Sequence, residues 1–231
     1  MAPTVGILVF PGSNCEHDVA EAVERLGARP RLVFHKDESL GPVDAVVLPG
    51  GFAHGDALRP GAIARFSPVM PAVERFAADG GPVVGICNGF QILTEAGLLP
   101  GALQKNRGLA FLCQEVDLVT ANDRSCLTAS VPVGTRLRVP INHFEGCYTA
   151  SAEVLADLED GGQVVVRYAA NPNGSAADIA GVCNTAGNVV GLMPHPERAS
   201  HDLLGSEDGN VLLGALLSGA ATARSRATIA L

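Results

Sequence analysis

The sequence predicts a three-layer α/β fold built on a mostly parallel central sheet, with a β-rich antiparallel extension. The first observation is that short apolar runs alternate with helical patterns from residue 5 to about residue 96. Alternation of this kind is typical of a parallel sheet with helices on both faces. The second observation is that strand-like runs joined by tight turns dominate between residues 109 and 192. Such runs favour antiparallel pairing.

The first half of the chain supplies the expected parallel strands and their helices. Residues 15–26 have apolar side chains at helical spacing, and Gly27 follows where a glycine often ends a helix. Cys87 stands between an apolar run and a second helical pattern. We therefore expect strands at 5–10, 31–35, 44–48 and 82–86, and helices at 15–26, 63–78 and from 88 onward.

The second half supplies the extension and a closing helix. We expect strands at 109–119, 135–139, 163–168, 179–184 and 188–192, a polar loop at 142–146, and helices at 154–158 and 209–221. No repeat, low-complexity segment or linker divides the chain. The prediction is one domain over residues 1–231, with a core at 1–223 and a frayed tail at 224–231.

Composition narrows the classes of function. The formal net charge is −8, and Lys36 and Lys105 are the two lysines. Without a basic stripe to neutralise phosphates, we expect no nucleic-acid partner. The six cysteines form no C-x-x-C pair, which favours a reducing compartment. Neither a signal peptide nor a bilayer-spanning run is evident, so the expectation is a cytoplasmic protein with no membrane partner.

The stretch around Cys87 carries the strongest functional signal. An apolar run ends at Cys87, which has Gly85 before it and Gly89 after it. A strand, a sharp turn and a helix in this order form a nucleophile elbow, in which small neighbours let the strand and the helix pass closely. The helix start also favours a thiolate. We predict that Cys87 is a catalytic nucleophile and that the Asn88 N–H helps to bind an oxyanion.

A nucleophilic cysteine needs a base and a group that orients the base. His195 and Glu197 are the best candidates, because prolines 194 and 196 favour an extended chain there. In an extended chain, residues i and i+2 point to the same side, so Glu197 would hold the imidazole. His54 and His143 are candidates to line the same site.

The second oxyanion donor is expected on a glycine-rich loop after a neighbouring strand. Gly50 and Gly51 follow the strand at 44–48, and we predict that the Gly51 N–H is this donor. An ordinary glycine turn is the competing interpretation.

These motifs together resemble the class I, triad-type glutamine amidotransferases, whose fold is flavodoxin-like. The matching stretches are 49–52, 85–91 and 195–197, and further motifs at 10–15, 51–56, 171–175 and 191–198 extend the resemblance over almost the whole chain. The further motifs resemble glutaminase subunits of purine biosynthesis. Phe144 is a departure, because the resemblance leads us to expect glycine between His143 and Glu145.

The resemblance implies that Cys87 attacks the side-chain amide of glutamine and that a glutamyl thioester is hydrolysed to glutamate and ammonia. It further implies that Gln91 contacts the glutamine and that Arg107 helps to hold its α-carboxylate. The chain shows no G-x-x-x-x-G-K-[ST] motif. The implied partners are a large synthetase subunit that binds ATP and Mg²⁺ and a small bridging subunit, with no cofactor and no metal in this chain.

Three other functions remain open at this point. The chain could serve an amidotransferase with another acceptor, or it could be a cysteine hydrolase or peptidase with the same elbow. It could also be a binding module in which Cys87 is inert or redox-sensing. A zinc role is not favoured, because the nearest approach to ligand spacing, residues 15–18, looks like the start of a helix.

Overall fold

One nine-stranded sheet runs through the molecule and positions every candidate residue. The computed structural model describes the backbone of residues 2–229 and the side chains of residues 2–222. The strand order is β2 (Arg29–Phe34), β1 (Thr4–Val9), β3 (Ala45–Leu48), β4 (Val83–Ile86), β11 (Val189–Leu192), β10 (Ile179–Cys183), β9 (Val164–Tyr168), β6 (Leu112–Thr120) and β7 (Arg136–His143).

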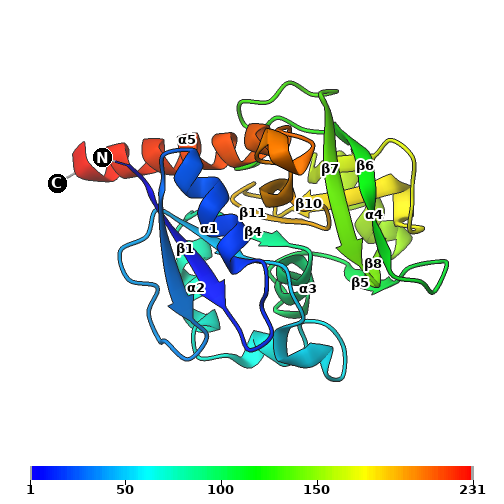
Figure 1. Ribbon diagram of the computed structural model, residues 1–231, viewed down its shortest axis with the longest axis horizontal. Coiled ribbons are helices and arrows are strands. Elements are labelled where there is room, and N and C mark those ends of the chain that lie inside the picture. The colour runs from blue at the N-terminus through cyan, green and yellow to red at the C-terminus, as the bar shows by residue number, and fades with distance from the viewer. Residues whose placement is uncertain (1, 230–231) are drawn as a thin grey trace.

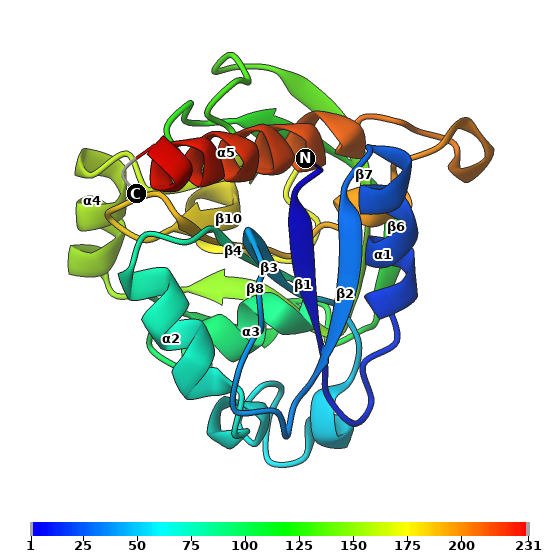
Figure 2. The ribbon, with the colours of Figure 1, turned by 90° about the vertical axis from the view of Figure 1, so that its left-hand side faces the viewer.

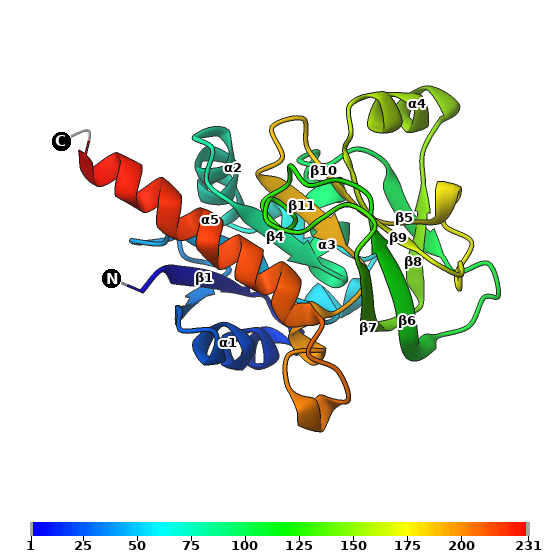
Figure 3. The ribbon, with the colours of Figure 1, turned by 90° about the horizontal axis from the view of Figure 1, so that it is seen from above.

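The first five strands of that order are parallel. For β1 to β4 this confirms the prediction. Strand β11 was expected in the antiparallel extension, but it pairs in parallel with β4, which corrects that expectation. Their order, β2-β1-β3-β4-β11, is that of a flavodoxin-like sheet. Helices α1 (Glu16–Arg25) and α5 (Gly209–Ile229) cover one face, and α2 (Met70–Ala78) and α3 (Asn88–Glu95) cover the other (Figure 3). Figure 2 shows β1 and β2 side by side, with α1 and α2 on opposite sides of them. The three-layer arrangement is therefore confirmed.

The antiparallel extension is also confirmed. Strands β10, β9, β6 and β7 continue the sheet in antiparallel pairs, and they form the green and yellow half of Figure 1. A two-stranded sheet of β5 (Ala102–Lys105) and β8 (Glu145–Thr149) and the helix α4 (Ala152–Asp160) complete this half. The sequence did not predict β5, which is four residues long and largely exposed.

The core follows from the apolar strands. Every residue of β3, β4 and β11 is buried, because these strands lie between the two helix layers. Val19, Ala22 and Val23 form the buried stripe of α1. Across residues 2–229, no helix combines the length and the apolarity that a membrane crossing requires.

The helix expected at 63–78 is broken, which corrects the prediction. A short 3₁₀ helix, η2 (Ala64–Phe66), comes first, and α2 begins only at Met70. Ser67 between them is extended, with ψ of 143°. Pro68 follows Ser67, and a proline disfavours the helical conformation of the residue before it.

Two further boundaries differ from the expectation. Residues 142–146 are not one polar loop: β7 runs to His143 and β8 begins at Glu145, so the chain turns at Phe144. Helix α5 continues to Ile229 instead of ending near residue 221. A frayed tail was expected at 224–231. The backbone of residues 224–229 belongs to α5, and the side chains there lie outside the described residues, so fraying stays a prediction.

Candidate active site

The candidate residues gather where parallel strands end. Gly51 follows β3, Cys87 follows β4 and His195 follows β11, and these three strands are neighbours in the sheet. The last residues of β4 and β11, Ile86 and Leu192, are paired, and the Cys87 N–H donates to the Leu192 carbonyl at 2.8 Å. Sites in open α/β sheets lie at this edge.

Cys87 has the backbone of a nucleophile elbow. Its φ of 51° and ψ of −105° lie in a region that residues with a side chain rarely adopt. A Cβ on Gly85 would come within 2.6 Å of the Gly89 carbonyl carbon, and a Cβ on Gly89 would collide with the Leu48 carbonyl. The two glycines therefore let α3 start directly against β3 and β4, as predicted.

The structure brings His195 and Glu197 together. His195 Nδ1 lies 2.6 Å from Glu197 Oε1, and both residues are 1% exposed. The route differs from the prediction, because residues 196–198 form a 3₁₀ turn, η4 (Pro196–Arg198), instead of an extended segment. His195 itself is non-helical, with φ of −105° and ψ of 85°. The turn, and not strand-like alternation, aims the carboxylate at the ring.

His195 is poised to carry a proton. Burial disfavours its charged form, but the charge of Glu197, with further influence from the nearby Cys87 and Cys15 thiols, outweighs burial and raises the His195 pKa well above its ordinary value. Among the described residues, Nε2 has no hydrogen-bond partner. An imidazole fixed at Nδ1 and open at Nε2 is the arrangement expected of a general acid and base.

Two backbone N–H groups stand next to the elbow. Gly51, with φ of 145°, adopts a conformation suited to glycine. Hydrogen bonds fix the residues on either side of Gly51. The Asn14 N–H donates to the Gly50 carbonyl at 3.3 Å, and the Phe52 N–H donates to the Gly12 carbonyl at 2.8 Å. Neither bond uses the Gly51 N–H. The Asn88 N–H opens α3, where the first N–H groups lack helical partners.

Side chains of α3 join the elbow to a neighbouring loop. Asn88 Oδ1 accepts the Ala53 N–H at 3.0 Å, and Asn88 Nδ2 donates to Gln91 Oε1 at 2.9 Å. Gln91 Nε2 in turn donates to the Glu145 carbonyl at 2.5 Å. This chain of bonds holds the walls of the cavity in front of Cys87.

The cavity has a volume of about 300 Å³. The charged residues of its lining are Asp56, Glu145 and Arg59. Its apolar lining includes Phe144, which stands where the resemblance leads us to expect glycine. The lining residues are Gly51, Phe52, Asp56, Leu58, Arg59, Pro60, Cys87, Gln91, Asn142, His143, Phe144 and Glu145.

Two lining residues have strongly shifted pKa values. Burial, followed by the charge of Glu145, raises the pKa of Asp56 to about 6. Burial, followed by the charge of His195, lowers the pKa of His143 to about 4. Near neutral pH the Asp56 carboxyl is therefore largely ionised and the His143 imidazole is neutral, and the Asp56 carboxylate favours a cationic group on the ligand.

Not every predicted residue reaches this cavity. Gly51, Cys87, Gln91 and His143 line it, whereas Asn88, His195 and Glu197 are not among its lining residues. Arg107 packs against Gly174, where an added Cβ would lie 2.8 Å from Arg107 Nε, and its proposed contact stays a prediction.

His54 packs on His35, with ring centroids 5.4 Å apart, and is not a lining residue.

Sequence reasoning missed Asp56, Arg59 and the Glu145 side chain as parts of the cavity. Asp56 and Glu145 lay within quoted motifs, and a search for acids beside the elbow could have found them. Arg59 carries no such signal. Its guanidinium is bonded to both carboxylate oxygens of Glu95, at 2.5 and 2.6 Å.

One group of side chains in the described part of the chain could approach a metal ion. Ligand atoms of Cys15, His195 and Glu197 lie within 4.8 Å of one another. However, Arg198 Nη2 lies 3.1 Å from the Cys15 sulfur and already places a positive charge there. That charge disfavours a metal cation at the same point.

A cysteine elbow, an oriented imidazole and two nearby backbone N–H groups at the end of a flavodoxin-like sheet are the arrangement typical of thiol-dependent acyl-transfer enzymes. Comparison with known proteins agrees. The model of the CobB/CobQ-like glutamine amidotransferase domain matches residues 2–207, and the chain belongs to this family.

Close relatives share one description. A phosphoribosylformylglycinamidine synthase subunit PurQ of Rubrobacter xylanophilus is 57% identical over 94% of this chain and 98% of its own length. A PurQ subunit of Parasynechococcus marenigrum is 53% identical over 93% of this chain and 100% of its own length. Within its family, the chain is of the PurQ type.

Solved structures support the same fold. A chain in the structure of PurLQS from Thermotoga maritima aligns with a TM-score of 0.88 at 42% identity, over 94% of this chain and 99% of that chain. A glutamine amidotransferase from the same organism aligns with a TM-score of 0.55 at 17% identity, over 96% of this chain and 93% of that chain, which shows the fold alone.

Proposed function

We propose that this chain is the glutaminase subunit of a phosphoribosylformylglycinamidine synthase. The observation that carries the proposal is the buried His195–Glu197 pair, joined at 2.6 Å, at the end of the strand next to the one that ends at Cys87, a cysteine held in an elbow conformation. The PurQ relatives, which match over almost their full length, support the choice of synthase. The proposed catalytic residues are Cys87, His195 and Glu197.

The first half-reaction breaks the amide of glutamine. The Cys87 sulfur attacks the side-chain carbonyl carbon as a thiolate, with its proton held on His195 Nε2. The Gly51 and Asn88 N–H groups stabilise the oxygen that becomes negative. The tetrahedral intermediate collapses with loss of ammonia, to which His195 returns the proton, and a glutamyl thioester remains on Cys87.

The second half-reaction regenerates the thiol. His195 takes a proton from water as the water oxygen attacks the thioester carbon. The carbon–sulfur bond breaks, glutamate leaves, and the proton returns to Cys87. Glu197 keeps the proton of Nδ1 in place throughout, so the same ring nitrogen faces the reacting atoms in both steps.

The cavity explains why a free amino acid fits. The carboxylates of Asp56 and Glu145 provide a site for the α-ammonium group of glutamine, and Gln91 lies between the elbow and Glu145. Arg59 is the cation of the lining, and we propose that the guanidinium N–H groups not bonded to Glu95 bind the α-carboxylate, in preference to Arg107. An acidic cavity of this size disfavours a peptide substrate, so the hydrolase and peptidase alternatives receive no support.

Ammonia released here needs an acceptor. We propose that a large synthetase subunit receives it and uses ATP and Mg²⁺ to convert formylglycinamide ribonucleotide to formylglycinamidine ribonucleotide, with a small bridging subunit in the complex. The Thermotoga maritima relative is part of a PurLQS structure, which supports this assembly. This step belongs to de novo purine biosynthesis, and we place it in the cytoplasm.

The proposal is tested by labelling and by transfer. A diazoketone analogue of glutamine should modify Cys87, as mapped by mass spectrometry, and Cys87→Ala should remove glutaminase activity. Cys113→Ala, at an exposed cysteine, is the matched control. In the reconstituted complex, nitrogen-15 from the glutamine amide should appear in formylglycinamidine ribonucleotide. Transfer to a different acceptor would replace the proposed synthase with another amidotransferase.

A further inference from the structure

The turn after β1 contacts both the loop that carries Gly51 and the His195–Glu197 pair. Its residues 12–15, which we call the β1 turn, pair with the loop that carries Gly51. The N–H groups of Asn14 and Cys15 donate to the Gly50 carbonyl at 3.3 and 3.2 Å, and Phe52 donates to Gly12 at 2.8 Å. The β1 turn therefore fixes the position of the proposed oxyanion donor.

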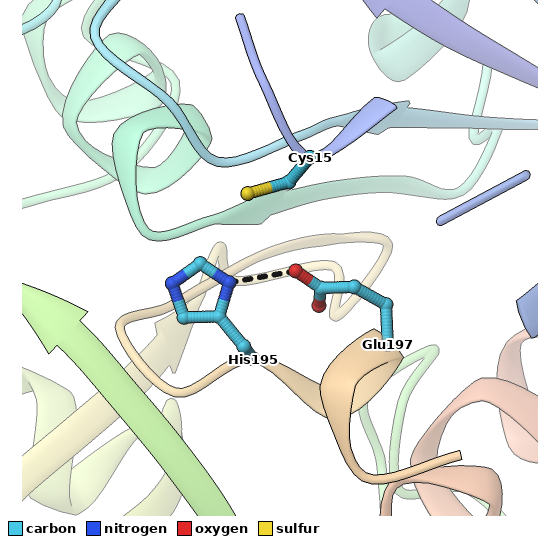
Figure 4. A group of neighbouring side chains, drawn as sticks. All are labelled: Cys15, His195 and Glu197. Atoms are coloured by element: carbon cyan, nitrogen blue, oxygen red, sulfur yellow. Dashed lines mark hydrogen bonds and ion pairs between the residues drawn. The ribbon is translucent and has the colours of Figure 1, made fainter. Parts of the chain in front are cut away.

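The side chain of Cys15 faces the His195–Glu197 pair. Its sulfur lies within 4.8 Å of a His195 ring nitrogen and a Glu197 carboxylate oxygen, and Figure 4 shows it directed toward the ring. A Cβ on Gly50 would lie 2.7 Å from His195 Cε1 and 3.0 Å from the Cys15 sulfur. Glycine at position 50 thus permits the imidazole and the thiol to pack on the same backbone atom.

The thiol has a fixed orientation. Cys15 is 2% exposed, and its S–H donates to Asn14 Oδ1 at 3.1 Å. Arg198 Nη2 donates to the sulfur at 3.1 Å, and Arg198 Nε binds Asp18 Oδ2 at 3.0 Å. With its proton directed at Asn14, the sulfur presents lone-pair density to Arg198 and to the ring.

We propose that Cys15 is a positioning residue, whose oriented sulfur holds the His195 ring in register with the Gly51 loop. This inference rests on the proposed glutamine hydrolysis. No covalent step is involved, because Cys87 remains the nucleophile. The arrangement also explains why position 15 carries a thiol: sulfur is a large, soft acceptor that can contact a guanidinium and an imidazole at once.

A purely structural role would give a different result. If Cys15 only filled space, removing its sulfur would lower stability and leave the His195 titration unchanged. If it positions the ring, the turnover number and the titration both change. The nearby Cys15 thiol is one of the influences that raise the His195 pKa. The other titratable or charged groups near the ring are Glu197, Cys87 and His143, with Arg198 behind the sulfur.

The experiment compares Cys15→Ala, Cys15→Ser and Arg198→Met with wild type and with the Cys113→Ala control. Glutamine hydrolysis is measured in the reconstituted complex. The expected result for Cys15→Ala is a fall in kcat of about 10- to 100-fold with KM within about twofold, because a displaced base slows the chemistry more than binding. Cys15→Ser should recover part of the loss, because the hydroxyl keeps a donor and an acceptor.

The second readout does not depend on activity. NMR of the His195 Cε1–H, assigned with His195→Asn, follows the ring titration in the full-length chain. We expect a lower midpoint in Cys15→Ala and no change in Cys113→Ala. Arg198→Met should shift the ring signal in the folded chain, and adding Cys15→Ala to it should cost little more, because both changes remove the same contact.

The outcomes separate the two proposals. An inactive wild-type complex would overturn the proposed function. An active wild type with Cys15→Ala kcat within twofold and an unmoved His195 midpoint would overturn the positioning role. If Cys15→Ala does not fold, Cys15→Ser and Arg198→Met test the positioning role instead. A wild-type kcat and a wild-type His195 midpoint in both variants would overturn the inference.

Discussion

Replacement of Glu197 by glutamine tests the core of the proposed chemistry. The two side chains have the same shape, so the exchange removes a charge and leaves the packing intact. Glu197 Oε1 lies 2.6 Å from His195 Nδ1, and both residues are 1% exposed. The amide can turn either its oxygen or its NH₂ group toward the ring, and the second choice would favour the wrong tautomer of His195.

The magnitude follows from that geometry. A hydrogen bond to a charged group contributes about 1.5–3 kcal/mol. At about 1.4 kcal/mol per tenfold change, its loss slows the reaction by about 10- to 100-fold. Loss of the correct tautomer adds to this, and the comparable change in a serine-protease triad costs about 10⁴-fold. We therefore expect kcat for glutamine hydrolysis to fall by roughly 10²- to 10⁴-fold in Glu197→Gln.

The assay measures glutamate release by the reconstituted complex at saturating glutamine. Glu153→Gln, at an exposed position on α4, is the control and should leave kcat unchanged. The NMR midpoint of His195 should also fall, because the Glu197 charge is the first of the influences that raise its pKa. A folded Glu197→Gln protein with more than about a third of wild-type kcat would refute a triad in which Glu197 orients the base.

Two further predictions concern the cavity and the elbow. Because the pKa of Asp56 is raised to about 6, mainly by burial and then by Glu145, its carboxylate takes up a proton as pH falls through that value. The KM for glutamine in the wild type should then rise below about pH 6. In Asp56→Asn the KM should be higher and should depend less on pH. A wild-type KM that does not change with pH would contradict this prediction. In Gly89→Ala, the new Cβ meets the Leu48 carbonyl, which cannot move aside as a side chain can. Denaturant unfolding should show that the free energy of unfolding falls by about 1–3 kcal/mol. In the control Gly108→Ala, where the space around the new Cβ is open, the free energy of unfolding should change little. Equal losses in the two variants would count against the close approach of Gly89 to Leu48.

Local patterns predicted much of this molecule. The glycines around Cys87 predicted the elbow, because only a glycine frame allows a helix to start so close to its strand. The alternation of strands and helices predicted four of the five parallel strands, and the parallel pairing of β11 with β4 was not predicted. The pairing of His195 with Glu197 was also predicted, although the reason given, an extended chain, was wrong: the 3₁₀ turn at 196–198 brings the carboxylate to the ring.

Other features depend on contacts between distant segments. Strand β5 forms because it can pair with β8, at least 40 residues later, and its own four residues carry no strand pattern. Cys15 approaches His195 across 180 positions, and its sequence neighbours point only to a helix start. The acids of the cavity were missed for a similar reason, since Asp56 lies in a short 3₁₀ helix after β3 and Glu145 begins β8, far away in the sequence.

The register between β4 and β11 determines whether the sulfur and the imidazole meet. Parallel pairing aligns Val83 with Val189 and Ile86 with Leu192, so both strands end at the same level. A register slip of one residue would carry the segment after β11 by about 3.3 Å and turn its side chains to the opposite face. The bond from the Cys87 N–H to the Leu192 carbonyl fixes that register at the elbow itself. The same strand pairing that completes the core therefore also sets the alignment of nucleophile and base, which explains how residues 108 positions apart in the sequence form one site.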